Sequence, residues 1–247
     1  AVGKAKGLSN LTKSGLNVPE GFVLINIREN YDFAVVENAY ITLGEKTVAV
    51  RSSALNEDGF QASFAGQYET ILNVKGITLL EQAIEKCLKS SISQRVDSYS
   101  GNFAQKNEIS TISIIVQNMV EAKYAGVIFT ACPVTGNKNT LVLNAVTGCG
   151  DALVSGYSEP DEYVISRNHK VLKKYIKGKT EFLSTELIHK LSLEALKAEK
   201  HFGYPLDMEW AIDKEDNILW LQARPITTLN EPTISELDSF LEDPMKS

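Results

Sequence analysis

Two short segments near the carboxyl end alternate between apolar and polar residues, and this alternation constrains the fold more than any other feature of the chain. The segments are residues 207–212 and 219–224, and residues 213–217 between them are polar and turn-like. A period of two is typical of strands that present one face to a core. Two such strands joined by a polar turn predict a β-hairpin, here centred between Glu215 and Asp216.

That register gathers four polar side chains on one face of the hairpin. Glu209 lies opposite Gln222, and Asp207 lies opposite Arg224. The other face is apolar and is expected to consist of Met208, Trp210, Leu221 and Ala223. Carboxylate and amide oxygens are ligands for Mg²⁺, and a guanidinium binds phosphate oxygens. The polar face is therefore suited to a hard cation and a phosphate, although two solvated cross-strand pairs would produce the same pattern.

The spacing of apolar residues divides the remaining chain into helices and strands. Helices are expected within the ranges 3–14, 26–46, 78–96 and 188–202, the third of them opened by the capping box of Thr78 and Glu81. Strands are expected at residues 22–25, 47–50, 112–116, 126–130, 140–143, 162–165 and 170–176. From residue 112 onward the chain is therefore expected to be mostly β.

A second polar cluster follows the strand at residues 47–50. Arg51 stands at the end of this strand, and Ser63 and Gly66 lie in the loop of small residues that comes after it. Such a loop lets backbone N–H groups approach an anion closely. The segment matches no P-loop signature, however, and an ordinary surface loop is an equal alternative. Lys4 would add a positive charge at the start of the first helix, although a single lysine is usually only solvated.

A third segment connects two stretches of predicted strand. It follows a buried strand and consists of Gln117, Asn118, Met119, Val120 and Glu121. A connection of this kind can serve as a hinge whose backbone hydrogen-bonds the edge of an adenine. The glycines at 148 and 150 are a weaker signal, because a tight turn explains them equally well.

The composition excludes several classes of protein. The 247 residues are 43% hydrophobic and 23% charged, with a net charge of −6, unlike a disordered, collagen-like or coiled-coil chain. No apolar run approaches the ~18 residues of a membrane helix, no signal peptide is visible, and no basic face is expected for nucleic acid. The three cysteines form no CxxC pair, which argues against a zinc site or disulfide framework and favours a cytoplasmic location.

Five segments of the chain resemble, in order, the N-terminal nucleotide-binding domain of the phosphoenolpyruvate synthase and pyruvate phosphate dikinase family, whose relatives include rifampin phosphotransferase. The segments are GKAKGLSNLTKSGLNVPEGFVLI, VAVRSSALNEDGFQASFAGQYETILNV, IIVQNMVEAKYAGVIFTACPVTG, GCGDALVSGYSEPDEYVI, and PLDMEWAID with WLQARPIT. They extend over nearly the whole chain to about Thr227. Each segment alone is weak, but five in the family's order are highly specific.

The resemblance implies an α+β, ATP-grasp-like, two-lobed nucleotide-binding fold with mostly antiparallel sheets. Residues 1–110 would form a shortened first lobe, residues 111–228 a second lobe with the hinge and the metal-binding hairpin, and residues 229–247 an acidic tail or linker. By position, Lys4, Arg51 and Arg224 would contact the phosphates and act in catalysis, and Glu209 and Gln222 would hold Mg²⁺. Further contacts to ATP are implied for Ser63, Gly66, Gln117, Met119, Val120, Glu121 and Asp207.

The chain also departs from the family pattern. Residues 26–46 are shorter than the corresponding helical section, Cys132 stands where aspartate is usual, and Asp151 stands where glutamate is usual. No glycine-rich segment with a phosphorylatable histidine follows residue 227, and the three histidines are expected to be solvated or half-buried.

The resemblance therefore predicts a phosphotransferase component that donates the β-phosphate of MgATP to a histidine on another domain or chain, releasing AMP and phosphate. That histidine would then phosphorylate a small-molecule acceptor, which the sequence does not identify. The isolated chain is expected to bind ATP without turning it over. The alternative is a nucleotide-binding module that regulates a partner without catalysis. Neither nucleic acid nor a membrane is expected as a partner.

Overall fold

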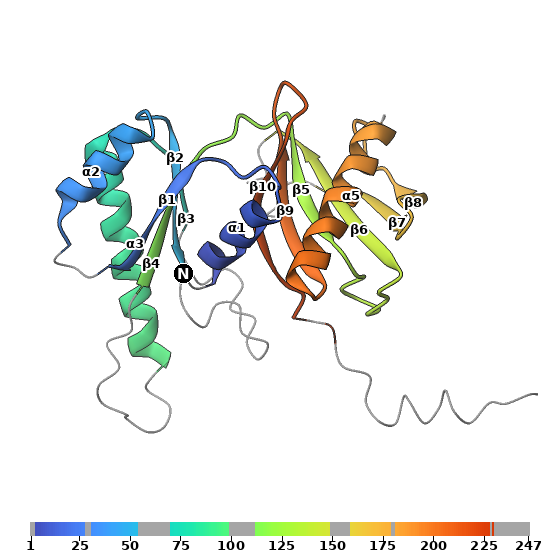
Figure 1. The fold of residues 1–247 in the computed structure, drawn as a ribbon, viewed down its shortest axis with the longest axis horizontal. Helices are drawn as coiled ribbons and strands as arrows, with labels where there is room; N and C mark the ends of the chain where they lie inside the picture. The colour runs from blue at the N-terminus through green and yellow to red at the C-terminus, as the bar shows by residue number, and fades with distance from the viewer. Residues whose placement is uncertain are drawn as a thin grey trace, which may run out of the picture.

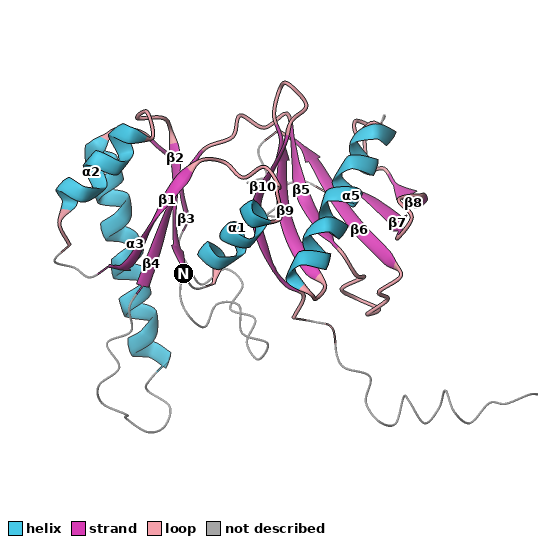
Figure 2. Cartoon of the chain, in the orientation of Figure 1, coloured by secondary structure: helices cyan, strands magenta, loops and turns pink. Residues whose placement is uncertain are grey.

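The chain folds into two antiparallel sheets, each with helices packed against it (Figures 1 and 2). The structure is a computed structural model that describes residues 3–27, 31–53, 70–98, 112–148, 159–178, 181–227 and 229. The sheets stand side by side, and two connections that are far apart in sequence, residues 14–20 and 119–123, run between them.

The first sheet has four strands in the order β1-β4-β2-β3. They are β1 (Gly21–Ile27), β4 (Ile112–Asn118), β2 (Val48–Ser53) and β3 (Thr70–Val74). Two helices, α2 (Phe33–Thr42) and α3 (Ile77–Ser98), cover one face of this sheet and share a core with it. Val48 and Val50 point into that core. Because strand side chains alternate, Arg51 lies on the opposite face.

The second sheet has six strands in the order β10-β9-β5-β6-β7-β8. They are β10 (Ile218–Pro225), β9 (Leu206–Ile212), β5 (Tyr124–Phe129), β6 (Thr140–Thr147), β7 (Asp161–Ser166) and β8 (Val171–Tyr175). Helix α5 (Thr185–Phe202) packs across one face of it. Ser184 caps the start of α5 by accepting a hydrogen bond from the Leu187 N–H, and Gly203 ends it in the left-handed conformation (φ 84°).

The predicted helices and strands of the described residues are confirmed, with differences at their ends. β2 continues through Ser53, and β6 runs four residues further than expected, to Thr147. Helix α3 already begins at Ile77, so Thr78 lies inside the first turn and is not its cap. The expected loop after Ser53 and the expected tail lie almost entirely outside the described residues.

The β9–β10 hairpin confirms the predicted polar pairs and corrects the predicted apolar face. Glu209 pairs with Gln222, and Asp207 pairs with Arg224, but the register shifts between Trp220 and Gln222. A bulge at Leu221 therefore brings Trp220, and not Leu221, into the core. The bulge is favourable because it buries the larger indole, which Leu221 would otherwise have displaced from the core.

Helix α1 (Lys4–Lys13) packs against β10 of the six-stranded sheet, and its Leu11 belongs to that core. The approach is close at Gly7, where an added Cβ would lie 2.4 Å from the Ala223 carbonyl oxygen. The expected division of the chain at residue 110 stays a prediction, but this helix adds a segment of the amino-terminal half to the second sheet.

No helix among the described residues is both long enough and apolar enough to cross a membrane.

Candidate functional site

The most informative contact of the structure joins the two sheets. Arg51, on the helix-free face of β2, places its Nη1 3.6 Å from Oε2 of Glu209 on β9. Their side chains are 15% and 32% exposed, respectively, so the pair is partly shielded from water. Arg51, from the second polar cluster of the sequence, therefore meets the polar face of the hairpin in space. We call Arg51, Asp207, Glu209, Gln222 and Arg224 the polar patch.

The second ion pair of the polar patch lies within the hairpin. Arg224 donates a hydrogen bond from Nε to Oδ2 of Asp207 at 2.9 Å, and its Nη2 lies 2.8 Å from the same oxygen. Burial is the largest influence on Asp207 and raises the pKa of its carboxyl; the nearby Glu209 charge raises it further, while Arg224 opposes both. Asp207 is thus held by a short, charge-assisted hydrogen-bonded pair.

Gln222 completes the patch. Its side chain is only 5% exposed, and it lies directly opposite Glu209 in the ladder. Among the described residues, none is recorded as a hydrogen-bond partner of its amide. Gln222 therefore presents its amide beside the Glu209 carboxylate on the polar face of the hairpin.

The same row of the sheet continues beyond Glu209. In register, Glu209 is followed by Val127 on β5, Asn144 on β6 and Glu162 on β7. The Oδ1 atom of Asn144 is buried and accepts no hydrogen bond from the described residues. Sequence reasoning missed Asn144, although a polar residue inside the apolar run 141–146 was a usable signal.

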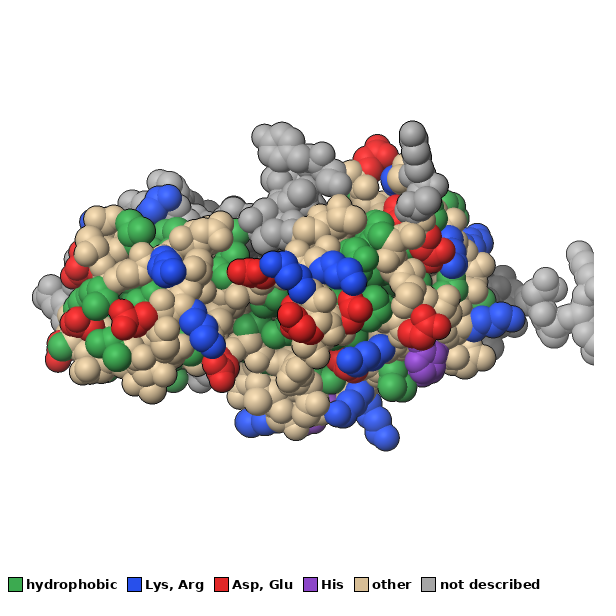
Figure 3. Space-filling model, turned by 90° about the horizontal axis from the view of Figure 1, so that it is seen from above, with side chains coloured by type: hydrophobic (Ala, Val, Ile, Leu, Met, Phe, Trp, Pro, Cys, Tyr) green, Lys and Arg blue, Asp and Glu red, His purple; other side chains and the backbone are tan. Residues whose placement is uncertain are grey.

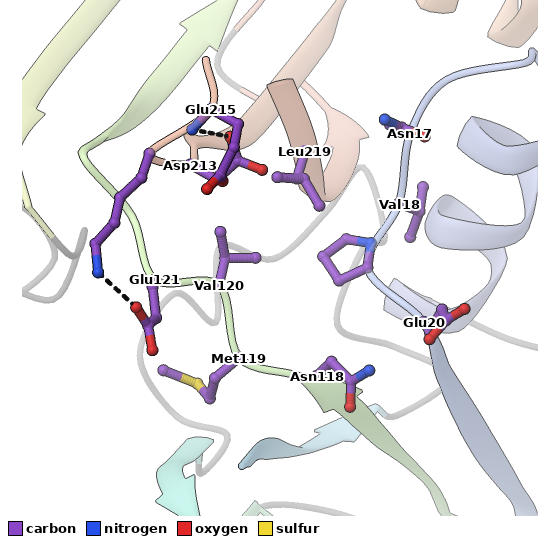
Figure 4. A pocket seen from close by; sticks show the side chains of 12 residues that line it. Asn17, Val18, Glu20, Asn118, Met119, Val120, Glu121, Asp213, Glu215 and Leu219 are labelled. Carbon is purple, nitrogen blue, oxygen red and sulfur yellow. Dashed lines mark hydrogen bonds and ion pairs between the residues drawn. The ribbon is translucent and has the colours of Figure 1, made fainter. Parts of the chain in front are cut away.

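A pocket of about 440 Å³ lies where the two connections meet the turn of the hairpin (Figure 4). It is lined by Asn17, Val18, Pro19, Glu20, Asn118, Met119, Val120, Glu121, Asp213, Lys214, Glu215 and Leu219. We call it the hinge pocket. Side chains of Val18, Val120 and Leu219 converge on it from three different elements. Four of the five predicted hinge residues line the pocket, and Gln117 does not.

Only some of the backbone N–H groups of the hinge donate hydrogen bonds to described residues. The Met119 N–H donates to the Thr47 carbonyl, and the Ala122 N–H donates to the Val120 carbonyl. No hydrogen bond of the Val120 or Glu121 N–H is recorded within the described part of the chain. Gln117 instead lies inside the first sheet, 4% exposed, with its amide 3.4 Å from the Pro19 carbonyl.

Exposed ion pairs connect the hinge to the hairpin turn. Lys214 lies 2.7 Å from Glu121, and Lys123 lies 2.8 Å from Asp216. The hydrogen bond from Lys214 lowers the pKa of the Glu121 carboxyl. On the face seen from above, Figure 3 shows acidic and basic side chains side by side. Such exposed pairs stabilise a surface little, so their contribution here is to orient the rim of the pocket.

The remaining predicted residues are placed as follows. Lys4 is half-buried and opens α1 after Gly3, one helical turn before the contact of Gly7 with Ala223. Lys4 therefore lies toward the Arg224 end of β10. Ser63 and Gly66 lie outside the described residues, as do Gly150 and Asp151. Within the described ranges, no group of three or more His, Cys, Asp or Glu side chains is arranged to hold a metal ion.

Comparisons with known proteins identify the family and the fold. The family model described as pyruvate phosphate dikinase, AMP/ATP-binding domain, matches residues 26–181 and 176–240. Two solved structures are similar in fold alone: the D-alanine-D-alanine ligase of Coxiella burnetii (TM-score 0.50, 13% identity, covering 96% of this chain and 51% of that one) and the VanG D-Ala:D-Ser ligase of Enterococcus faecalis (TM-score 0.50, 11% identity, covering 90% and 52%). The fold is ATP-grasp-like and α+β, as the resemblance implied.

Curated relatives match most of the chain. A probable phosphoenolpyruvate synthase of Pyrococcus horikoshii is 38% identical over 226 residues, which is 79% of this chain and 28% of the relative. The prodigiosin synthesizing transferase PigC of Serratia marcescens is 30% identical over 286 residues, covering 93% of this chain and 32% of the relative. The chain thus spans about a third or less of the length of these two relatives. With the matches to the family model and to these relatives, the chain belongs to the pyruvate phosphate dikinase AMP/ATP-binding domain family and is an ATP-binding domain of the phosphotransferase type.

Proposed function

We propose that this domain binds MgATP with the base in the hinge pocket and the phosphates over the polar patch, and donates the β-phosphate to a histidine of another domain or chain, releasing AMP and phosphate. The observation that carries the proposal is the Arg51–Glu209 contact. It brings a phosphate-binding cation and an oxygen ligand for a metal together from two sheets, beside a pocket lined by the hinge.

The hinge pocket and the polar patch lie on one face of the second sheet. Leu219 of the pocket pairs with Ala211, two residues from Glu209 and therefore on the same side of the strand. Asp213, also in the pocket, is four residues from Glu209, or about 13 Å along the strand. A nucleotide whose base contacts the hinge therefore extends its phosphates toward the patch. The N–H groups of Val120 and Glu121, which donate to none of the described residues, supply donors for the edge of the base.

The donor set of the polar patch fits Mg²⁺. Glu209 and Gln222 offer a carboxylate and an amide oxygen on directly opposite positions of the ladder, with Asp207 beside them. Mg²⁺ prefers oxygen ligands and usually completes its shell with water and substrate phosphates, so a site with few protein ligands is suitable. The bound metal would neutralise charge on the phosphates during transfer.

The cationic residues would orient the phosphates. Arg51 approaches from the first sheet, Arg224 from the hairpin and Lys4 from the start of α1. Ser63 and Gly66, which lie outside the described residues, are proposed to contribute from the segment between β2 and β3. Electrostatic stabilisation by groups that are already in position is the main catalytic contribution expected in phosphoryl transfer.

The chain's own histidines lie on the wrong side of the sheet to accept the phosphate. His189 and His201 belong to α5, which packs on the face opposite to Glu209. His169 contacts the same helix: its ring lies 5.0 Å from that of His189, and its Nδ1 lies 2.9 Å from the Ser192 hydroxyl. Direct transfer needs an acceptor about 3–3.5 Å from phosphorus. The acceptor histidine is therefore proposed to come from elsewhere.

Thermal melting with and without MgATP tests nucleotide binding. A ligand that binds only the native state at 100 times its Kd raises the free energy of unfolding by about 2.7 kcal/mol. We expect a clear increase in Tm with MgATP and none with a magnesium-free sugar phosphate as control. If no adenine nucleotide changes the Tm, the proposed function is wrong.

Release of AMP tests the transfer. The purified domain should form AMP only when a phosphohistidine domain of a family member is added, and Arg51→Ala or Arg224→Ala should abolish that reaction. Rapid AMP formation by the domain alone, with phosphate on one of its three histidines, would contradict the external acceptor. Binding of ATP without AMP formation in the presence of several such domains would favour a regulatory nucleotide-binding module instead.

A further inference from the structure

The two arginine–carboxylate pairs of the polar patch differ in how firmly they are made. Arg224 donates a hydrogen bond to Asp207 from Nε at 2.9 Å, and its Nη2 lies 2.8 Å from the same oxygen. Arg51 and Glu209 are 3.6 Å apart, which exceeds the distance of a good hydrogen bond. In addition, Arg51 Nε is buried and donates to no described residue. The Arg51 guanidinium is therefore attracted to Glu209, while its Nε has no acceptor among the described residues.

Both members of this looser pair have a proposed ligand of their own. A phosphate would bind Arg51, and a divalent cation would bind Glu209 together with Gln222. Each ligand must therefore compete with the ion pair. A phosphate competes with Glu209 for Arg51, and a cation competes with Arg51 for Glu209. A polyphosphate that arrives alone engages Arg51 but leaves the Glu209 carboxylate unpaired beside negative phosphates. A cation that arrives alone engages Glu209 but leaves the Arg51 guanidinium unpaired beside a positive ion. Like charges at such short range repel each other.

We infer that the Arg51–Glu209 ion pair is a specificity device that makes the site select a metal–polyphosphate complex over a free polyphosphate or a free cation. Only the complex supplies a new partner to both residues at once, so the ion pair is exchanged and neither charge is left uncompensated. The Asp207–Arg224 pair, with contacts of 2.9 and 2.8 Å, stays closed. This inference rests on the proposed function, because it assumes that the patch binds MgATP.

The inference makes an unusual prediction for Glu209→Gln, which removes a proposed metal ligand. Arg51 no longer has a competing carboxylate, so ATP in the absence of metal should bind about 5–10-fold more tightly than to the wild type, the range expected for a partly buried ion pair of 1–1.4 kcal/mol. The increase in ATP affinity that Mg²⁺ produces in the wild type should be lost. A purely structural role for Glu209 would not raise the affinity for any ligand.

Titration calorimetry with ATP in excess EDTA and with ATP in excess Mg²⁺ measures both quantities. The matched control is Glu162→Gln, the same substitution in the same row of the sheet. Glu162 lies on β7, and β5 and β6 separate it from Glu209 on β9. It removes a negative charge that forms no ion pair with Arg51, so it should change the affinity for metal-free ATP less than twofold. In an Arg51→Gln background, Glu209→Gln should also have less than a twofold effect.

The reciprocal variant gives an independent measurement. Without nucleotide, Arg51→Gln should bind Mn²⁺, used as a spectroscopic probe for Mg²⁺, more tightly than the wild type by a similar factor, because Glu209 has lost its internal partner. The inference is wrong if the wild type binds MgATP but Glu209→Gln does not bind metal-free ATP more tightly, or if Glu162→Gln has the same effect. A Glu209→Gln protein that does not fold leaves the Arg51→Gln measurement to decide. Failure of the wild type to bind any adenine nucleotide would overturn the proposed function and this inference with it.

Discussion

The two faces of the β9–β10 hairpin are built from neighbouring residues of the same strands but have opposite properties. On one face Met208, Trp210 and Trp220 are fully buried and pack in the core shared with α5. On the other face Asp207, Glu209 and Gln222 lie beside two arginines. The first face holds hydrophobic surface away from water, and the second holds charges in fixed positions. Stability and ligand binding should therefore be separable by substitutions only one or two residues apart.

The core face should show the largest effect, at Trp220. Trp220→Ala removes a fully buried indole and its hydrogen bond to Glu194 (2.7 Å), and should lower the free energy of unfolding by about 3–5 kcal/mol. Leu221→Ala, at the bulge next to it, should cost about 1 kcal/mol because Leu221 is only half-buried. Urea denaturation at constant m-value measures both. A larger effect of Leu221→Ala would contradict the bulged register.

Gly126→Ala, on the neighbouring strand β5, should also lower stability by disturbing the core side of the sheet. The new Cβ would lie 1.9 Å from the Asn144 carbonyl oxygen and 2.7 Å from Cζ2 of Trp210, so backbone or indole must move. Overpacking of this kind typically costs about 1–3 kcal/mol. The preceding residue offers a control. Ala125→Gly removes a methyl group instead of adding one, and it should change the melting temperature less. A Gly126→Ala protein as stable as the wild type would show that the ladder between β5 and β6 is looser than described.

On the polar face, Gln222→Ala should weaken binding more than folding. We expect the Kd for MgATP to rise about tenfold, which is 1.4 kcal/mol, because one oxygen ligand is lost. The affinity for metal-free ATP and the free energy of unfolding should change much less. Gln222→Glu keeps an oxygen ligand and should retain more of the metal-dependent affinity, as calorimetric titration would show. An equal loss with and without Mg²⁺ would argue against a metal ligand at this position.

The smallest effect concerns how the contribution of Asp207 to the free energy of unfolding depends on pH. Burial raises the pKa of its carboxyl in the folded protein above the ordinary value of 3.8, so the folded state binds more protons than the unfolded state between these two values. The contribution of this group to stability is complete below pH 3.8 and is lost as the pH rises through the folded-state pKa. The difference in unfolding free energy between wild type and Asp207→Asn should therefore fall with rising pH across that interval.

Denaturant unfolding at a series of pH values measures that difference. Asp213→Asn is a suitable control, because hydrogen bonds from the Asn217 side chain and the turn backbone lower the pKa of that carboxyl. Its pH dependence should have the opposite sign. Parallel profiles for the two variants would contradict the assignment of Asp207 to a buried, desolvated position.

Local sequence patterns were sufficient to predict the helices, the two polar pairs of the hairpin and every described strand except β3 (Thr70–Val74), which was not expected. The reason is that alternation sets which residues share a face, and a hairpin turn sets which residues stand opposite each other. The same reasoning located Arg51 on its strand, although β2 continues two residues beyond it, and the hinge after β4. Local patterns could not show the bulge at Leu221, because the choice between Leu221 and Trp220 depends on the volume that α5 and the neighbouring strands leave in the core.

The sequence by itself thus determined the family, the order of the elements and the residue types of the candidate site. Only the tertiary structure decided which of these residues meet. The Arg51–Glu209 contact, the packing of α1 on β10 and the convergence of Val18, Val120 and Leu219 on the hinge pocket all join segments that are far apart in the chain. Such contacts depend on how two sheets stand relative to each other, and no local periodicity carries that information.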